Sequence, residues 1–231
     1  MKLPRQPAAV IFDMDGLLFD SERLYAQAIL TAASEVGCPM SHEIFLQLVG
    51  RSREVNHAFL LGHYGPDYPL QALIAAWGRH FRELARGGLP LKPGAIELLD
   101  LLDDLCLPRA IATSSTHATV QANLLVHSLA NRFHDVVAHG DYAAGKPAPD
   151  PFLKAAERLG VAPSLCLALE DSHNGVRSAS AAGMMAVMVP DLIPATDEIH
   201  GLCTHVVDDL HVVRLLLETD RQRTGETSSE P

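Results

Sequence analysis

VIFDMDGLLFDSE, the segment from Val10 to Glu22, decides the fold of this chain. Its first half is an unbroken apolar run, which is typical of a strand in a parallel sheet that is covered on both faces. The run ends in two aspartates, Asp13 and Asp15, followed at once by Gly16. Alternate residues of a strand point to the same side, so the two carboxylates are expected to share one side at the end of a buried strand.

The same kind of apolar run recurs along the chain, with helical patterns between the runs. Further strands are expected at 109–113, 135–138, 165–169, 185–189 and 205–207. Apolar residues at helical spacing, bounded by proline, serine or glycine, predict helices over 93–105, 150–160 and 172–183. Strand and helix alternate, so the sequence predicts an α/β fold with a doubly wound, Rossmann-like parallel sheet.

Residues 20–88 interrupt this alternation, because they contain helical patterns with no strand between them. We expect them to form an inserted α-helical domain. The α/β core would then comprise residues 1–19 and 89–218. The polar segment 219–231 is expected to be a disordered tail.

Composition narrows the class of partner. The formal net charge of -10 argues against nucleic-acid binding and against binding to anionic membranes, since both usually need a basic surface. No apolar stretch approaches the ~20 residues that cross a bilayer, and the N-terminus lacks a signal-peptide pattern. The four cysteines are widely separated in the sequence, which is typical of free thiols in a protein of a reducing compartment. We expect a cytoplasmic protein, as a monomer.

Polar residues follow the predicted strands at the edge where such sheets bind ligands. They are Asp13 and Asp15, then Thr113, Ser114 and Ser115, then Lys146 in the loop GKPAPD, and finally Glu170 and Asp171. Clustered carboxylates repel one another, and a hard divalent cation relieves this repulsion. Mg2+ suits such a site, because it is commonly bound by a few carboxylates together with water and a phosphate. The Thr113 hydroxyl, the backbone N–H groups around Ser114 and the Lys146 ammonium suit the oxygens of a phosphate.

The motifs DMDG, ATSS, GKPAPD and LEDSHNG, in this order, resemble those of the haloacid dehalogenase-like superfamily. Within it the chain resembles the beta-phosphoglucomutase-like phosphatases, which carry a helical cap after the first motif. The resemblance implies that Asp13 is the nucleophile and Asp15 the general acid and base.

The same resemblance implies the remaining roles. Thr113, Ser114 and Lys146 would bind the phosphoryl group. Mg2+ would be held by Asp13, by the backbone carbonyl of Asp15 and by Asp171. Glu170 would either ligate the metal or orient its waters.

These residues predict a Mg2+-dependent phosphatase that hydrolyses a small phosphate monoester, such as a sugar phosphate, through an aspartyl-phosphate. Asp15 disfavours carbon–halogen cleavage, because the relatives that perform it lack an acid there. Arg53, in GRSRE, falls at the cap arginine of the sugar-phosphate mutases and is the candidate substrate-binding residue. A phosphomutase remains the alternative, and a phosphate- or metal-binding protein without catalysis is a further one.

Overall fold

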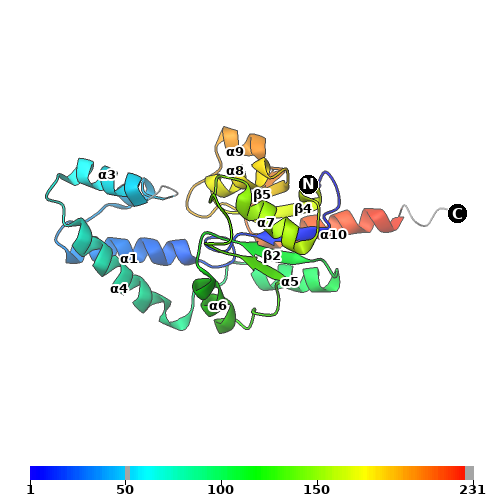
Figure 1. The fold of residues 1–231 in the computed structure, drawn as a ribbon, viewed down its shortest axis with the longest axis horizontal. Helices are drawn as coiled ribbons and strands as arrows, with labels where there is room; N and C mark the ends of the chain where they lie inside the picture. Colours follow the sequence, from blue (N-terminus) through cyan, green and yellow to red (C-terminus); the bar gives the residue numbers. More distant parts are fainter. Residues whose placement is uncertain (50–52, 227–231) are drawn as a thin grey trace. The chain divides into compact units, whose positions relative to one another are not determined.

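The computed structural model describes residues 1–49 and 53–226 (Figure 1). By its internal contacts the chain divides into two compact units. The sheet unit comprises Met1–Phe19 and the chain from Pro90 onward, and the helical unit comprises Asp20–Leu89. From the sequence, the inserted helical segment was expected at 20–88.

The sheet unit is built on one parallel sheet, as predicted. Its strands are β1 (Ala9–Phe12), β2 (Arg109–Ala112), β3 (Asp135–Val137), β4 (Cys166–Glu170), β5 (Met185–Met188) and β6 (His205–Val206). They lie in the order β3-β2-β1-β4-β5-β6 as a six-stranded sheet. Every residue of β1 and β4 is buried, which explains their unbroken apolar sequences.

Helices cover both faces of this sheet (Figure 1). The helices of this unit are α5 (Ala95–Asp104), α6 (His117–Val126), α7 (Asp150–Leu159), η2 (Pro163–Leu165), α8 (His173–Ala181), α9 (Asp197–Leu202) and α10 (Leu210–Glu226). α7 packs against β1, β2 and β3, and α8 packs against β4 and β5. α5 and α10 contact each other, and α5 lies on the face opposite α7.

The direction in which successive strands are added to the sheet reverses at β1. The chain proceeds outward from β1 to β2 and β3, and then returns to β4 on the other side of β1. Ile11 of β1 pairs with Ala110 of β2 and with Ala168 of β4. Residues that follow these three strands therefore meet at the switch point, where open α/β sheets bind ligands.

The C-terminal helix α10 is described as far as Glu226. Its first half carries a helical pair, in which Arg214 donates to Glu218 at 2.6 Å, four residues on. The disordered tail expected from the polar segment 219–231 stays a prediction. Residues 227–231 lie outside the described part. No helix among the described residues is long and apolar enough to cross a membrane.

The helical unit contains α1 (Ser21–Glu35), α2 (His42–Leu46), α3 (Arg53–Tyr64), α4 (Leu70–Leu84) and η1 (Ala85–Gly87). α1 and α4 pack along each other. Arg79 of α4 forms an ion pair with Glu35 of α1, and His80 Nε2 is hydrogen-bonded to Glu35 Oε2 at 2.7 Å. The ring of Tyr25 stacks on Phe81, with centroids 4.1 Å apart. Arg53 was predicted to bind the substrate, but its side chain lies outside the described part of the structure.

Candidate active site at the carboxyl edge of the sheet

Asp13 is placed at the switch point by backbone pairing. Its N–H donates to the carbonyl of Leu169 at 2.9 Å, so the pairing of β1 with β4 extends one residue beyond the strand. The residue is only 7% exposed. The buried strand thus brings a carboxylate to the edge of the sheet and leaves it largely out of solvent.

Lys146 joins two acids that lie on neighbouring strands. Its Nζ donates to Asp13 Oδ1 and, at 2.5 Å, to Glu170 Oε1. The ammonium also lies 5.0 Å from the centroid of the Phe152 ring, within the range of a cation–π interaction. The side chain of Lys146 is 7% exposed, so this is a buried cation between two buried acids.

Burial and charge shift the pKa values of this group in a consistent way. Burial raises the pKa of Asp13 to about 8, and the charge of Glu170 adds to this while Lys146 opposes it. Burial alone would lower the pKa of Lys146, but the charges of Asp13 and Glu170 outweigh it and raise the pKa above its ordinary value. One ammonium therefore does not fully neutralise the acids at this edge.

Glu170 is completely buried, and both of its oxygens have partners. While Oε1 accepts from Lys146, Oε2 accepts from the N–H groups of Asp171 and Ser172 and from Ser172 Oγ. Ser172 also caps α8, because its Oγ accepts from Gly175 N at 3.1 Å. A Cβ at Gly175 would lie 1.8 Å from Glu170 Cδ, so only glycine fits there.

Asp171 completes an acidic cluster. One carboxylate oxygen each from Asp13, Glu170 and Asp171 lie within 4.8 Å of one another. Gly16 makes room for this cluster. It has a φ of +86°, and a Cβ there would lie 2.3 Å from Asp171 Oδ2. The glycine that follows the two aspartates thus allows the chain to turn and allows Asp171 to approach it.

Asp15 is held by a different element from Asp13. Its Oδ2 accepts a hydrogen bond of 2.7 Å from Ser115 Oγ, in the loop after β2. The N–H of Ser115 in turn donates to Thr113 Oγ1 at 3.0 Å. Thr113 is buried, whereas Ser114 is exposed. The structure thus joins Asp15 to the ATSS loop, and it joins Asp13 to Lys146.

Three residues of this region were not among the predicted site residues. Ser115 belongs to the ATSS motif but was given no role. Lys92 and Asp191 form an ion pair, with Nζ and Oδ1 2.7 Å apart. Asp191 Oδ2 is buried without a hydrogen-bond partner among the described residues, and it lies 3.4 Å from where a Cβ of residue 16 would be. Its position soon after β5 was the available sequence signal, because acids after the other strands had been singled out.

Comparison with known proteins finds close counterparts across most of the chain. A family model described as haloacid dehalogenase-like hydrolase matches residues 7–183. A probable pseudouridine-5'-phosphatase of Drosophila melanogaster is 39% identical over 204 residues, which cover 82% of this chain and 84% of that protein. Protein CbbY of Cupriavidus necator is 36% identical over 210 residues, covering 84% and 82% of the two chains.

A solved structure gives the same picture for the fold. A putative beta-phosphoglucomutase from Thermotoga maritima superposes with a TM-score of 0.76 at 26% identity. The match covers 91% of this chain and 98% of the other. The likeness therefore extends over both units of the chain.

Proposed function

The chain belongs to the haloacid dehalogenase-like hydrolase family, and we propose that it is a phosphatase. It hydrolyses a small phosphate monoester, with Mg2+ and through an aspartyl-phosphate on Asp13, as a cytoplasmic monomer. The observation that carries the proposal is the buried contact of Lys146 with Asp13 and Glu170 beside Asp171. That arrangement combines a nucleophile, a phosphate-binding cation and a set of metal ligands at one point.

The first half-reaction transfers the phosphoryl group to the enzyme. A carboxylate oxygen of Asp13 attacks phosphorus, and the bond between phosphorus and the leaving oxygen breaks. Asp15 donates a proton to that oxygen, so the alcohol leaves neutral. Lys146, the Thr113 hydroxyl and the backbone N–H of Ser114 hold the phosphoryl oxygens.

The second half-reaction restores the enzyme. Asp15, now ionised, takes a proton from water as the water attacks phosphorus. The bond between phosphorus and Asp13 breaks, and inorganic phosphate leaves. The hydrogen bond from Ser115 supports this dual role of Asp15, because it holds this carboxylate from a different loop than the one whose Lys146 holds Asp13.

The donor set fits Mg2+. The acids of the cluster offer only oxygen ligands, and a Cβ would close the space that Gly16 leaves against Asp171. The raised pKa of Asp13 supports the same reading, since a nearby divalent cation would favour its ionised form. When bound, Mg2+ supplies positive charge that favours attack on an anionic phosphoryl group.

Individual metal ligands follow from the partners of each acid. Asp13, Asp171 and the backbone carbonyl of Asp15 would hold the ion. Both oxygens of Glu170 are engaged by Lys146 and by the start of α8. We therefore assign Glu170 to holding Lys146 in place. The orphaned Oδ2 of Asp191 would accept a hydrogen bond from a metal-bound water.

The helical unit Asp20–Leu89 would act as the cap that admits substrate and excludes bulk water. Arg53 would contact the leaving group. A phosphomutase shares the same core chemistry and is the alternative, favoured by the likeness to a putative beta-phosphoglucomutase. The probable pseudouridine-5'-phosphatase favours hydrolysis. Residues 20–88 contain no lysine, which disfavours the mutases because they carry one in the cap.

The test is release of inorganic phosphate from a panel of metabolite monophosphates with Mg2+, and again with EDTA. Beta-glucose 1-phosphate with its bisphosphate activator is included, so that formation of glucose 6-phosphate would identify a mutase. The proposal predicts Mg2+-dependent phosphate release from at least one ester. Inertness towards the whole panel with Mg2+ would contradict it.

A further inference from the structure

The loop between β3 and α7, which carries Lys146, is bonded directly to the loop that follows β2. The N–H of His139 donates to the carbonyl of Ser115 at 2.8 Å. The hydroxyl of Tyr142 donates to the carbonyl of Thr113 at 3.1 Å. Both loops contribute groups that hold the phosphoryl oxygens in the reaction proposed above, so these bonds join the two halves of the phosphate site.

The bond from Tyr142 occupies a place that the sheet leaves open. β2 pairs with β3 as far as the N–H of Thr113, which donates to the carbonyl of Val137 at 3.0 Å. In a regular parallel ladder the next bond would run from the N–H of His139 to the carbonyl of Thr113. That N–H bonds to Ser115 instead, so the ladder ends here and a side chain supplies the donor for the Thr113 carbonyl.

The carbonyl of Thr113 belongs to the same peptide group as the N–H of Ser114. A peptide group is planar and trans, so its C=O and its N–H point in opposite directions. A hydrogen bond that fixes the carbonyl therefore also fixes the direction of the N–H. It polarises the group as well, which makes that N–H a stronger donor. Tyr142 is thus connected to a phosphate-binding N–H through one rigid peptide group.

The ring of Tyr142 is restrained by the core and by its own loop. It packs against the buried cluster of the sheet unit that includes Phe152. The Phe152 ring in turn lies 5.0 Å from the ammonium of Lys146. A Cβ on Gly145, the residue before Lys146, would be in ordinary contact with the Tyr142 ring at 3.7 Å. The side chain therefore lies against the segment that delivers the lysine.

Asp141, the residue before Tyr142, anchors the loop to two helices. Its Oδ2 accepts from the N–H of Ala138 at 3.0 Å. The same oxygen lies 2.9 Å from His117 Nε2 of α6 and 3.2 Å from Arg158 of α7. The start of the loop is thus fixed on both sides, and Tyr142 projects from an anchored backbone.

We propose that Tyr142 is a positioning residue for phosphoryl transfer. Its hydroxyl sets the Thr113–Ser114 peptide so that the Ser114 N–H points at the phosphoryl oxygens. Because it does so from the loop that delivers Lys146, it keeps the two donors at a fixed separation. This inference rests on the phosphatase function proposed above, and it adds a residue that acts without contacting the substrate.

A hydroxyl that served only the fold would give a different pattern of effects. Its removal would lower the free energy of unfolding and would leave the affinity of the folded protein for phosphate unchanged. Removal of a hydroxyl that orients a donor weakens phosphate binding by the folded protein. The affinity for Mg2+ depends on acids that follow β1 and β4, so it should change in neither case and serves as an internal control.

Tyr142→Phe removes the hydroxyl and keeps the ring. Calorimetric titration with inorganic phosphate in the presence of Mg2+ should give an affinity about fivefold weaker than that of the parent. Titration with Mg2+ alone should give the same affinity for both. Tyr64→Phe, the same change in α3, is the matched control and should bind phosphate as the parent does. Replacing Tyr142 by p-aminophenylalanine returns an N–H donor to the same place and should restore the affinity.

The amide proton of Ser114 reports on the peptide itself. In isotope-labelled protein observed by NMR with Mg2+, its resonance should move downfield when phosphate is added, because a hydrogen bond to an anion deshields the proton. The movement should be smaller in Tyr142→Phe. During turnover, kcat/KM of this variant should fall roughly tenfold, since a misdirected donor stabilises the transition state less.

The inference is overturned if Tyr142→Phe binds phosphate as tightly as the parent, or if the Ser114 resonance responds equally in both. Absence of phosphate binding by the parent would overturn both the positioning role and the phosphatase function. Phosphate binding that depends on the Tyr142 hydroxyl, without hydrolysis of any ester, would support the positioning role and overturn the phosphatase function.

Discussion

Ser115 Oγ donates a hydrogen bond of 2.7 Å to Asp15 Oδ2, between residues 100 positions apart in the sequence. Asp13, two residues before Asp15, is bound instead by Lys146. The two aspartates of DMDG are therefore held by different loops of the sheet edge. Each can keep its own orientation, which separate roles as nucleophile and as proton carrier require.

We predict that Ser115→Ala lowers kcat about tenfold with little change in KM, because a hydrogen bond to a charged group is worth ~1.5 kcal/mol. Steady-state phosphate release measures this. Ser115→Thr keeps the hydroxyl and should recover most of the rate. A loss that Ser115→Thr does not recover, or a lowered melting temperature in Ser115→Ala, would mean that the serine serves packing.

Gly175→Ala should displace the buried side chain of Glu170 and so disrupt the active site. The new Cβ would lie 1.8 Å from Glu170 Cδ, and Glu170 is completely buried. We expect a loss of at least ~2 kcal/mol in unfolding free energy, with loss of phosphatase activity, by urea denaturation and kinetics. Gly201→Ala in α9 is the control, since nothing lies within 4 Å of its Cβ. Equal stability of the two variants would contradict the packing described for Glu170.

Asp191 Oδ1 bonds to Lys92, whereas Asp191 Oδ2 has no hydrogen-bond partner among the described residues. Variants of these two residues test whether Asp191 Oδ2 supports the metal site. Asp191→Asn should weaken Mg2+ binding by roughly tenfold, as loss of an outer partner of a metal site typically does. Isothermal titration calorimetry measures the affinity without substrate. Lys92→Met removes the same ion pair but keeps the carboxylate, so it should not weaken Mg2+ binding. Equal weakening in both variants would show that only the ion pair matters.

The ion pair between Asp103 and Arg109 of β2 should make the free energy of unfolding depend on pH. Its bond to Arg109, a residue only 3% exposed, lowers the pKa of Asp103 below the ordinary 3.8. The stabilisation is therefore present above that ordinary value and is lost as the pH falls through the folded-state pKa. Half of the Asp103 side chain is exposed and screened by solvent, so Asp103→Asn should cost only ~1 kcal/mol at pH 7.

Urea denaturation of the parent and of Asp103→Asn at neutral and acidic pH tests this sign. The difference between them should shrink as the pH falls below the ordinary pKa of aspartate. A difference that stays constant or grows in acid would contradict the assigned ion pair.

The sheet could be predicted because its sequence signal is local. Buried parallel strands need unbroken apolar runs, and β1, β2, β4 and β5 are buried at every position. Acids directly after such strands mark the ligand edge, which is how Asp13, Asp15 and Asp171 were found.

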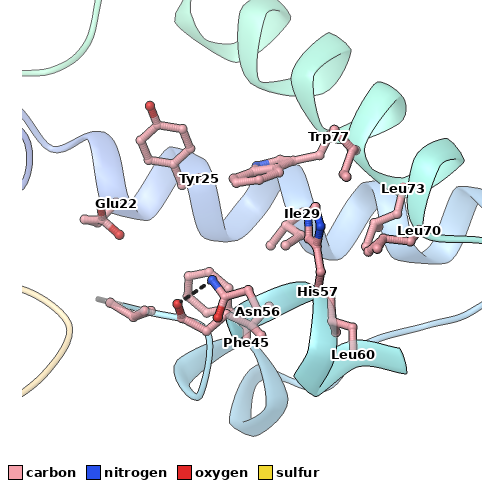
Figure 2. A pocket seen from close by; sticks show the side chains of 13 residues that line it. Glu22, Tyr25, Ile29, Phe45, Asn56, His57, Leu60, Leu70, Leu73 and Trp77 are labelled. Carbon is pink, nitrogen blue, oxygen red and sulfur yellow. Dashed lines mark hydrogen bonds between the residues drawn. The ribbon is translucent and has the colours of Figure 1, made fainter. Parts of the chain in front are cut away.

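What could not be predicted depends on contacts between distant segments. The hydrogen bond of Ser115 to Asp15, the pairing of Lys92 with Asp191 and the burial of both oxygens of Glu170 follow from side-chain orientation, which apolar periodicity does not encode. A cavity beside Trp77 in the helical unit arises from how α1, α3 and α4 pack (Figure 2).

The central claim is that Asp13 carries the phosphoryl group. The most direct test is acid quench of the enzyme during turnover with Mg2+ and a hydrolysed ester, followed by mass spectrometry of the peptide that contains Asp13. We predict a fraction of that peptide with the added mass of one phosphoryl group, absent in Asp13→Asn and absent without Mg2+. Steady phosphate release by Asp13→Asn, or a phosphoryl group on another residue, would contradict the assignment.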